Sequence, residues 1–538
     1  HKLVRDESFA PDPQCDTYQE YLKLGEAVEP VSLRHAFDFH FPEQKLELGE
    51  VEAREAILKR FGTGGMSFGA INAESQRDLI LAMKEIGGRS NSGEGGENPY
   101  YFTEGVTSTM KQIASGRFGV TAEYLRAADE LQIKISQGAK PGEGGQLMSV
   151  KVDEDIARAR HALPGTDLIS PPPMHDIYSI EDLKELIYEL KQLHPTARVN
   201  VKLTAGEGIG TIAVGVAKAG ADSIHISGGD GGTGAATLTS MKHAGLPWEI
   251  GLAKAHRALV ENDLRKTVRL SVDGGLSTGK DIIVAAVLGA DEYEFGKLLL
   301  VAQGCIMARI CEKNTCPTGI ATHDPKFKAK YKGTKEHVVR LMQMLAEDVR
   351  QHLAALGAKS IEDIIGRSDL LCTNERHLEL INARKLDFSF FFNNASQESG
   401  TGQSVFYEGI SSLNQSILEK TRSVIAKDGR TKLTCNIKSV DRAIPATLAG
   451  EIAMKGSRYS KSDESTAKSE TPFKGQVQID FTGSAGQGFG VFMVQGMYIR
   501  LFGEANDSVC KSMSGGKMVI RPNVKATFKA EQNSIIGN

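Results

Sequence analysis

The sequence predicts an α/β protein whose main unit is a (β/α)8 TIM barrel. Short apolar segments alternate with helix-like segments from about residue 60 to residue 310, and eight such repeats in about 250 residues match the size of a TIM barrel. Polar, glycine-rich residues follow several of the predicted strands, at the end where the chemistry of barrels gathers. A doubly wound open sheet is the competing architecture.

Each predicted barrel strand is a short run followed by polar residues. In chain order the candidate strands are 66–68, 89–91, 133–136, 167–170, 199–203, 223–227, 268–272 and 292–295. Glycine-rich turns follow the second, third, sixth and seventh of them, at 90–96, 137–140, 228–232 and 273–275. Four such turns on one predicted face favour a binding site over chance.

The organisation of the chain follows from changes in its pattern. Residues 1–55 are irregular and read as an incomplete lead-in, 56–372 as the barrel domain, 373–472 as a helical linker and 473–538 as a glycine-rich repeat. An amphipathic helix is predicted over 335–357, and 457–471 is predicted to be mobile because it is rich in Ser, Lys, Glu and Thr. The chain starts with His rather than Met, so we expect a processed chain or a fragment.

The C-terminal repeat predicts a right-handed β-helix. Ile479, Ile499 and Ile520 recur at intervals of 20 and 21 residues among many glycines. Regular short strands with glycine turns are typical of β-solenoids. Only about three coils fit before the last residue, so this repeat reads as the beginning of a longer stack.

Composition excludes several function classes. The chain has 538 residues, enough for two or three domains. Its 40% hydrophobic and 24% charged residues are typical of a globular protein with a sizeable core. A net charge of −3 gives no basic face for nucleic acid, and no run of 18 apolar residues predicts a membrane span. Seven cysteines, an odd number, predict a reducing compartment, either bacterial cytoplasm or plastid.

Three closely spaced cysteines follow the last predicted strand. Cys305, Cys311 and Cys316 lie within twelve residues, and Pro317 follows them. Thiolates on one short, turning segment are the ligands of iron–sulfur clusters, and three ligands suit a three-iron cluster or a four-iron cluster with one open corner. The alternatives are three unrelated thiols or a zinc loop, although structural zinc usually takes four ligands in Cys-x2-Cys pairs.

Two predicted loops have the features of a phosphate site. Residues 273–279 follow the seventh strand, and Gly296 and Lys297 follow the eighth, where barrels usually bind phosphate. Glycine exposes backbone N–H groups that bind anions. Lys202 ends the fifth strand, where a flavin barrel would use it to stabilise negative charge on the reduced ring. The alternatives are a tight glycine-rich turn and a surface lysine.

Cations gather around the third predicted strand. Lys134, Lys140 and Arg160 lie on or after it, and Gln146 lies among them. A dicarboxylate substrate needs two cationic anchors, and arginine binds a carboxylate through two parallel hydrogen bonds. Each of these residues taken alone is more often a solvated surface charge. His225 reads as a packed barrel histidine.

Several long motifs resemble the synthase domain of glutamate synthase. They are 64–71, 90–97, 137–146, 170–176, 227–234 and the cysteine loop 305–316. The resemblance covers about residues 55–370, and Gly483-x2-Gly486-x3-Gly490 resembles the start of that family's glycine-repeat β-helix. It implies an FMN barrel with a 3Fe-4S cluster, in which 2-oxoglutarate and ammonia are converted to L-glutamate by reductive amination.

The resemblance also assigns roles to residues. For catalysis it implies Lys140, Gln146 and Glu181, and for 2-oxoglutarate binding Lys134, Lys140, Gln146 and Arg160. For FMN it implies Gly65, Met66, Ser67, Lys202, Ser227, Gly228, Gly229, Asp273, Gly274, Gly275, Gly296 and Lys297, and for the cluster Cys305, Cys311 and Cys316. Glu181 is expected where the family couples its two active sites.

The resemblance leaves the partners and two alternatives open. Large chains of this family begin with a glutaminase domain whose first residue is a catalytic cysteine, whereas this chain begins with His1 and its first cysteine is Cys15. Ammonia is therefore expected from a glutaminase domain that this sequence lacks. No Gly-x-Gly-x-x-Gly motif joins a strand to a helix, so reduced ferredoxin or an NAD(P)H-oxidising subunit is expected to supply electrons. The competing hypotheses are another FMN barrel of the 2-hydroxyacid oxidase type and a degenerate, non-catalytic barrel.

Overall fold

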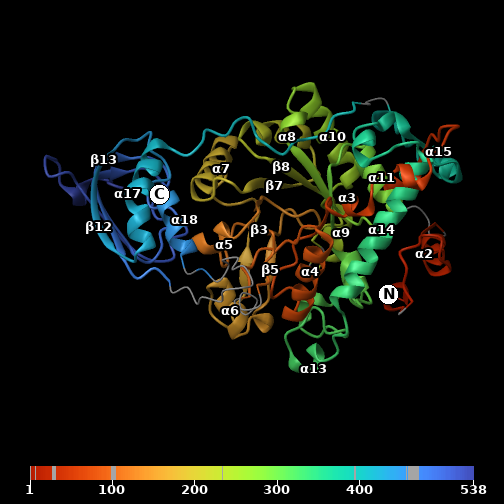
Figure 1. Cartoon of the computed structure of the whole chain (residues 1–538), viewed down its shortest axis with the longest axis horizontal. Coiled ribbons are helices and arrows are strands. Elements are labelled where there is room, and N and C mark those ends of the chain that lie inside the picture. Colours follow the sequence, from red (N-terminus) through yellow and green to blue (C-terminus); the bar gives the residue numbers. More distant parts are fainter. Residues whose placement is uncertain are drawn as a thin grey trace.

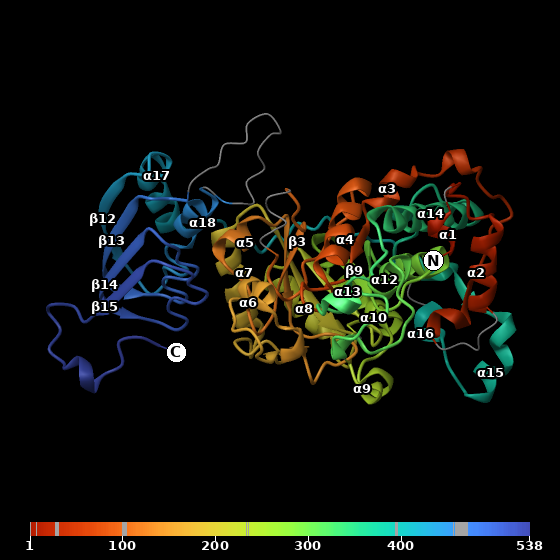
Figure 2. The ribbon, with the colours of Figure 1, turned by 90° about the horizontal axis from the view of Figure 1, so that it is seen from below.

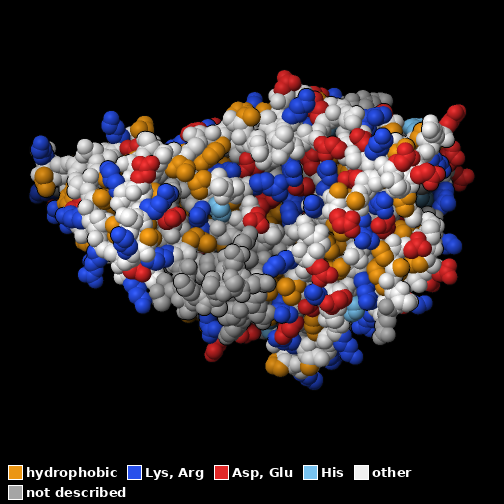
Figure 3. All heavy atoms as spheres, viewed as in Figure 1, with side chains coloured by type: hydrophobic (Ala, Val, Ile, Leu, Met, Phe, Trp, Pro, Cys, Tyr) orange, Lys and Arg blue, Asp and Glu red, His pale blue; other side chains and the backbone are white. Residues whose placement is uncertain are grey.

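Two units form the molecule, a barrel unit and a smaller C-terminal unit beside it (Figure 1). The computed structural model describes residues 2–6, 8–26, 32–98, 105–232, 234, 236–392, 396–455, 457 and 472–537. No helix in these ranges is long and apolar enough to cross a membrane. Charges of both signs are interspersed over the face seen in Figure 3.

The barrel is a closed ring of parallel strands. Its named strands are β2 (Phe61–Thr63), β3 (Met110–Ile113), β4 (Glu130–Lys134), β7 (Arg198–Thr204), β8 (Ser223–Ser227), β9 (Arg269–Asp273) and β10 (Glu292–Phe295). They pair in the order β2-β10-β9-β8-β7-β4-β3. Two parallel bridges, Gly62 to Arg89 and Asn91 to Met110, join the two edge strands through residues 89–91. The predicted eight-stranded barrel is confirmed, and the open sheet is wrong.

Two of the predicted strands need correction, and one strand of the barrel was not predicted. The first barrel strand is β2, which precedes the predicted 66–68. The predicted strand 167–170 lies outside the barrel, because β6 (Leu168–Ser170) pairs antiparallel with β5 (Gly145–Leu147). The strand missing from the prediction is β3. Its apolar pattern is interrupted by Lys111, whose buried ammonium lies 2.6 Å from Glu97 Oε2 and also donates to the Ser108 carbonyl.

Helices follow most of the barrel strands along the chain. They are α3 (Arg54–Leu58), α4 (Ala73–Ile86), α5 (Ala122–Arg126), α6 (Glu154–Arg160), α7 (Ile180–Leu193), α8 (Ile209–Lys218), α9 (Leu238–His243), α10 (Trp248–Glu261), α11 (Gly279–Val287), α12 (Lys297–Ala302), α13 (Pro325–Lys328) and α14 (Lys335–Ala355). The last of these confirms the predicted amphipathic helix. Its apolar stripe packs on α11, α4 and α3, and Thr334 caps its first turn by accepting from the His337 N–H.

The lead-in packs on the barrel unit. It contains α1 (Lys2–Arg5), α2 (Asp16–Glu26) and β1 (Phe37–Phe39), and later segments that meet it contain β11 (Leu371–Thr373), α15 (Leu378–Ala383) and α16 (Ser389–Phe392). Strand β1 pairs antiparallel with β11. The hydroxyl of Tyr18 donates to Asp348 Oδ2 on α14 at 2.7 Å. These contacts hold the N-terminal segment against β11 and α14.

The C-terminal unit is a parallel sheet with two helices. It contains α17 (Ser412–Ala426), β12 (Arg430–Ile437), α18 (Ala446–Met454), β13 (Gln476–Ala485), β14 (Met497–Ala505) and β15 (Lys517–Arg521). Each strand pairs with the next one, as Figure 2 shows. Ile479 pairs with Ile499, whereas Ile520 pairs with Leu501. The sheet begins inside the predicted linker, because the outward residues of β12 are polar and hide its strand pattern. The predicted mobile stretch lies outside the described residues except for Ser457.

Candidate active site

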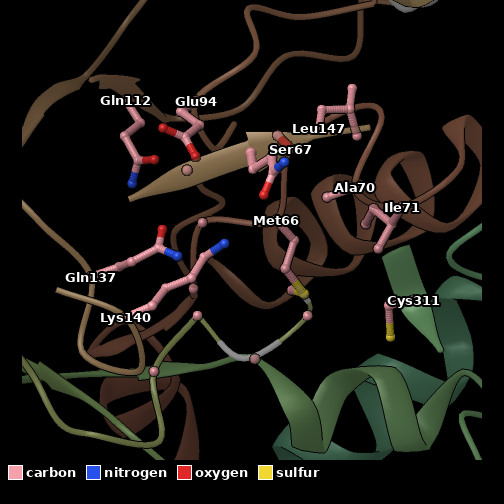
Figure 4. Close-up of a pocket in the computed structure, with 18 of the residues that line it drawn as sticks. Met66, Ser67, Ala70, Ile71, Glu94, Gln112, Gln137, Lys140, Leu147 and Cys311 are labelled. Atoms are coloured by element: carbon pink, nitrogen blue, oxygen red, sulfur yellow. The ribbon is translucent and has the colours of Figure 1, made fainter. Parts of the chain in front are cut away.

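A cavity opens at the carboxyl end of the barrel strands, where the predicted residues were expected to meet. Of these residues, Gly65, Met66, Ser67, Lys134, Lys140, Gln146, Arg160, Lys202, Asp273, Gly274, Gly275, Gly296, Lys297 and Cys311 line it. Figure 4 shows Lys140, Gln137 and Met66 around the space, with Cys311 on its other side. The predicted phosphate loops, the predicted substrate cations and one predicted cluster ligand therefore share one cavity.

Lys140 is a buried cation that faces the cavity. Its side chain is 3% exposed. Within the described residues, no hydrogen-bond acceptor and no carboxylate within 4.0 Å pairs with its ammonium group. Burial lowers the pKa of Lys140, and Glu143 opposes this shift. The ammonium lines the cavity and has no carboxylate beside it in the described part of the chain, so its charge is available to a negative ligand group.

Arg160 lies at the end of α6 and reaches the same cavity. One of its terminal nitrogens donates to Ser67 Oγ and to the Phe68 carbonyl, both at 3.0 Å. Its guanidinium stacks over the Phe118 ring at 5.7 Å. Burial lowers the pKa of Arg160 to about 10, against the attraction of Glu94. The side chain is held in place by neutral partners, which leaves its charge available to a ligand.

Lys134 ends strand β4 beside Arg160. Its ammonium lies 3.0 Å from Glu94 Oε1 and donates to Gln137 Oε1 at 2.5 Å. Burial lowers the pKa of Lys134, and Glu94 opposes this shift. Glu94 therefore compensates one of the three cations, and the cavity retains a net positive lining. This sign suits a dicarboxylate.

Gln146 and Glu181 differ from these cations in exposure. Gln146 lies on β5 and is exposed, although it lines the cavity rim. Glu181 lies in the first turn of α7, is fully solvated and does not line the cavity. Its predicted role in coupling to another active site stays a prediction.

Four charged side chains meet at the base of the cavity. Lys202 Nζ lies 2.6 Å from Asp273 Oδ2, and His225 Nε2 lies 3.1 Å from the same oxygen. The other ring nitrogen of His225 lies 3.4 Å from Glu294 Oε1. Attraction to Lys202 and His225 holds the pKa of Asp273 far below its usual range, although burial acts against it. Ser227 donates to Asp273 Oδ1 at 2.6 Å, so it supports this group from behind and does not line the cavity.

Glycines shape the predicted phosphate site. Gly274 and Gly275 adopt φ values of 123° and 96°, which side chains rarely tolerate. A Cβ added to Gly231 would lie 2.6 Å from Asp273 Oδ1. Lys297 begins α12, and its ammonium lies 3.2 Å from Asp230 Oδ1. Close backbone approach and a lysine at a helix start suit a phosphate group.

Gly228 and Gly229 lie behind the cavity wall. Neither residue lines the cavity. A Cβ added to Gly228 would meet the Trp248 backbone nitrogen at 2.9 Å, and one added to Gly229 would meet the Gly245 carbonyl at 2.8 Å. Their role in this structure is close packing of the loop against α10.

The three cysteines gather beside the cavity. Cys305 and Cys311 are half-buried and Cys316 is buried. Burial raises the pKa of the Cys311 thiol, and the nearby Cys305 and Cys316 raise it further. The mutual influence of the three thiols on this pKa shows that the three predicted ligands lie near one another.

Lys151 links the cysteine loop to the cavity wall. Its ammonium donates to the Cys311 carbonyl at 3.2 Å and to the Ala70 carbonyl at 2.8 Å. No sequence pattern distinguishes this lysine from surface lysines. Gln112 also lines the cavity, and the sequence did not predict it as a site residue because its strand, β3, was not predicted. Glu94 lines the cavity too, and it lies in a glycine-rich turn that the sequence analysis had identified.

Comparison with known proteins identifies the family. A family model described as a conserved region in glutamate synthase matches residues 2–359, and a model described as the GXGXG motif matches residues 414–538. The chain belongs to the glutamate synthase family. The resemblance stated from the sequence is confirmed by this match.

Three curated relatives show the range of the family. Chloroplastic ferredoxin-dependent glutamate synthase of Oryza sativa subsp. japonica is 44% identical over 100% of this chain. Ferredoxin-dependent glutamate synthase 2 of Synechocystis sp. is 46% identical over 97%, and the glutamate synthase (NADPH) large chain of Azospirillum brasilense is 45% identical over 97%. The matched part is 34% of each relative, so the chain spans about a third of their length.

Solved structures with similar folds are more distant. Flavocytochrome b2 with pyruvate bound has a TM-score of 0.41 and 16% identity, covering 66% of this chain and 79% of that chain. Mandelate oxidase with (S)-4-hydroxymandelic acid has a TM-score of 0.40 and 14% identity, covering 63% and 88%. Likenesses at this level carry no argument about function.

Proposed function

We propose that this member of the glutamate synthase family catalyses the synthase reaction, in which 2-oxoglutarate, ammonia, two electrons and two protons give L-glutamate and water. The observation that carries the proposal is the ammonium of Lys140, which has no ion-pair partner among the described residues and faces a cavity that Arg160 and Cys311 also line. Such a cavity combines a site for an anionic substrate with a route for electrons. The role of each residue below is part of the proposal.

The cations would orient the substrate. Arg160 would bind one carboxylate of 2-oxoglutarate through its other terminal nitrogen, Nη1, in a charge-assisted hydrogen bond, and Gln146 at the rim would donate its amide to the other. The ammonium of Lys140 would donate a proton to the oxygen that leaves as water when ammonia condenses with the keto group. Its lowered pKa makes that proton easier to release near neutral pH.

The residues present fit FMN. The glycine turn at Gly274 and Gly275 with Lys297 would bind the phosphate, and Lys202 would lie beside the electron-rich edge of the ring. FMN supplies the hydride that reduces the imine. Lys202 is already neutralised by Asp273 at 2.6 Å, so the local charge at the ring would depend on this pair. Met66, Ser67 and Gly65 would border the ring.

The cysteine loop fits a 3Fe-4S cluster. Cys305, Cys311 and Cys316 supply three thiolates, and Cys311 lines the cavity itself. A cluster held there would lie next to the proposed flavin site, where it would supply electrons one at a time. We propose no fourth cysteine ligand, because the other four cysteines lie elsewhere in the sequence.

The partners follow from the same chemistry. Reduced ferredoxin or an NAD(P)H-oxidising subunit would supply electrons, since relatives of both kinds match this chain equally well. A glutaminase domain would supply ammonia, and a reducing compartment, cytoplasm or plastid, would keep the thiols available. We also propose that the C-terminal sheet is the start of a right-handed β-helix, which begins at β12 rather than at the predicted residue 473.

Two measurements test the proposal. The purified chain should show flavin absorption bands together with broad iron–sulfur absorbance, and with an artificial reductant it should make glutamate from 2-oxoglutarate and ammonium salts. Flavin bands alone, with oxidation of a 2-hydroxyacid, would indicate the oxidase type. A preparation shown to contain both cofactors that still gave no glutamate would overturn the proposal.

A further inference from the structure

A lysine of the C-terminal unit reaches two carboxylates of the barrel unit. Lys511 lies in the turn between β14 and β15, and its Nζ lies 2.5 Å from Glu189 Oε2 and 3.7 Å from Asp176 Oδ2. Glu189 is on α7 and is fully buried. A buried carboxylate needs a cation beside it, so the pairing of Glu189 with Lys511 fixes the position of the β14–β15 turn against α7. The backbone of the turn is also anchored, because the Lys511 carbonyl accepts from the Phe492 N–H at 2.9 Å.

The second carboxylate continues this contact toward the cavity. Asp176 forms an ion pair with Arg117, which directly precedes Phe118. Phe118 lines the cavity, and its ring supports the guanidinium of Arg160 at 5.7 Å. A series of ion pairs and ring contacts therefore joins Lys511 to Arg160.

Two hydrogen bonds from backbone N–H groups to serine hydroxyls join segment 115–118 to segment 170–176. Gly116 N–H donates to Ser170 Oγ at 2.9 Å, and His175 N–H donates to Ser115 Oγ at 3.4 Å. Ser170 lines the cavity and pairs with Gly145, next to Gln146. Segments 115–118 and 170–176 are therefore joined directly, and each contains a residue that lines the cavity, Phe118 and Ser170 respectively.

We propose that Lys511 is a positioning residue for the substrate site, acting from the C-terminal unit through Asp176 and Arg117. The inference rests on the proposed function, because it assumes that Arg160 binds 2-oxoglutarate. Loss of the Lys511 charge would release segments 115–118 and 170–176, and Arg160 would lose the fixed ring beneath it. Displacement of a binding group by about 1 Å can cost about 100-fold in rate.

Arg442 offers a matched control. It joins the same two units through α7, because its terminal nitrogens lie 2.6 Å from Glu185 Oε2 and 3.1 Å from Glu408 Oε2. Its guanidinium also lies 4.1 Å from the Tyr188 ring centre. Among the described residues it has no ion pair with segment 115–118 or 170–176. Removal of Arg442 would therefore loosen the junction of the units without releasing the cavity wall.

The experiment compares Lys511→Met, Lys511→Arg and Arg442→Met in the whole chain with its cofactors bound. Flavin and iron contents are measured first, then kcat and KM for 2-oxoglutarate with ammonium and an artificial reductant. We expect Lys511→Met to raise KM about 10-fold or more, Lys511→Arg to restore most of it, and Arg442→Met to leave KM unchanged. Equal effects of the two Met variants on KM, or none from Lys511→Met, would overturn the inference.

Asp176→Asn keeps the test decisive if Lys511→Met does not fold. This variant removes the charge nearer the cavity but leaves the buried pair of Lys511 and Glu189 intact. It should also raise KM for 2-oxoglutarate, and an unchanged KM would contradict the inference. Failure of the proposed function looks different, because the unmodified chain with both cofactors would then show no turnover of 2-oxoglutarate.

Discussion

Both units of this protein are built on parallel strands, yet their interiors have opposite chemistry. Inside the barrel, Lys202, His225, Asp273 and Glu294 meet on adjacent strands and are almost fully buried. Inside the C-terminal sheet the corresponding positions are apolar, for example Val477, Ile479, Phe481, Ile499 and Leu501, all with no exposed surface. Apolar burial stabilises a fold directly, whereas buried charges rarely do.

The difference supports the proposal that the barrel is the binding unit and the C-terminal sheet a supporting unit. The buried charges of the barrel are arranged in pairs, as with Lys202 and Asp273 at 2.6 Å, which limits their cost. Buried charged side chains lower the stability of a fold, so a cluster of them indicates a functional site. The C-terminal sheet has no such interior group near its described strands, and its ion pair of Asp480 and Arg500 lies on the outer side.

The largest expected effect concerns the cluster. Cys311→Ser should remove the iron and the broad iron–sulfur absorbance, because two remaining thiolates do not hold a three-iron cluster. Iron analysis and absorption spectroscopy measure this, while bound flavin is followed separately. Cys435→Ser in the C-terminal sheet is the control and should keep all its iron. Full iron content in the Cys311 variant would remove this residue from the ligand set.

The second prediction tests the supporting role of the C-terminal sheet. Phe481 is fully buried and packs edge-on against Phe489 at 5.4 Å. Phe481→Ala should lower the free energy of unfolding by about 3–5 kcal/mol, because it deletes a buried ring and leaves a cavity. Denaturant unfolding of the C-terminal unit measures this change. The iron and flavin contents of the folded variant should not change, and loss of either cofactor would contradict the separation of roles.

The third prediction tests the binding role of the barrel. Arg160→Ala should raise the KM for 2-oxoglutarate about 10- to 150-fold, since a hydrogen bond to a charged group is worth about 1.5–3 kcal/mol. Steady-state kinetics with ammonium as co-substrate measure the change. Arg500→Ala, on the outer side of the C-terminal sheet, is the matched control and should leave KM unaltered. If both variants had the same KM as the parent chain, Arg160 would lie outside the substrate site.

The last prediction concerns a difference in acid sensitivity. Burial lowers the pKa of His256 to about 3 and that of His323 to about 4, helped by Arg265 and Lys151 respectively. Their pKa values in the unfolded chain are about 6.5, so the unfolded state takes up protons first as pH falls. Each histidine therefore supports stability above about pH 6.5, and this support declines by up to about 1.4 kcal/mol per pH unit toward pH 4.

This decline should be confined to the barrel unit. Residues 414–538 contain no histidine, so the C-terminal sheet lacks this source of acid sensitivity. His256→Gln should flatten the loss of barrel stability between pH 6.5 and 4, measured by denaturant unfolding at several pH values. An unchanged slope would show that His256 does not titrate as its burial implies.

The sequence predicted the barrel and most of the cavity because these depend on local patterns. Glycine-rich turns and polar residues at strand ends were enough to locate Lys140, Lys202 and Gly274, which all line the cavity. The same patterns missed β3, where Lys111 is compensated by Glu97, because ion pairs between distant residues leave no local pattern. For the same reason the sequence did not predict the roles of Lys151 and Lys511, because their partners are far away along the chain.

The closure of the barrel also sets an order for making the protein. Strand β10 must pair with β2, which joins residues more than 200 positions apart, so the ring cannot close until residue 295 has left the ribosome. Strands β13 and β14 join residues only about 20 positions apart, and each coil can settle on the previous one as it is made. Contacts distant in sequence form slowly, so the growing barrel is the part that chaperones would need to shield during synthesis.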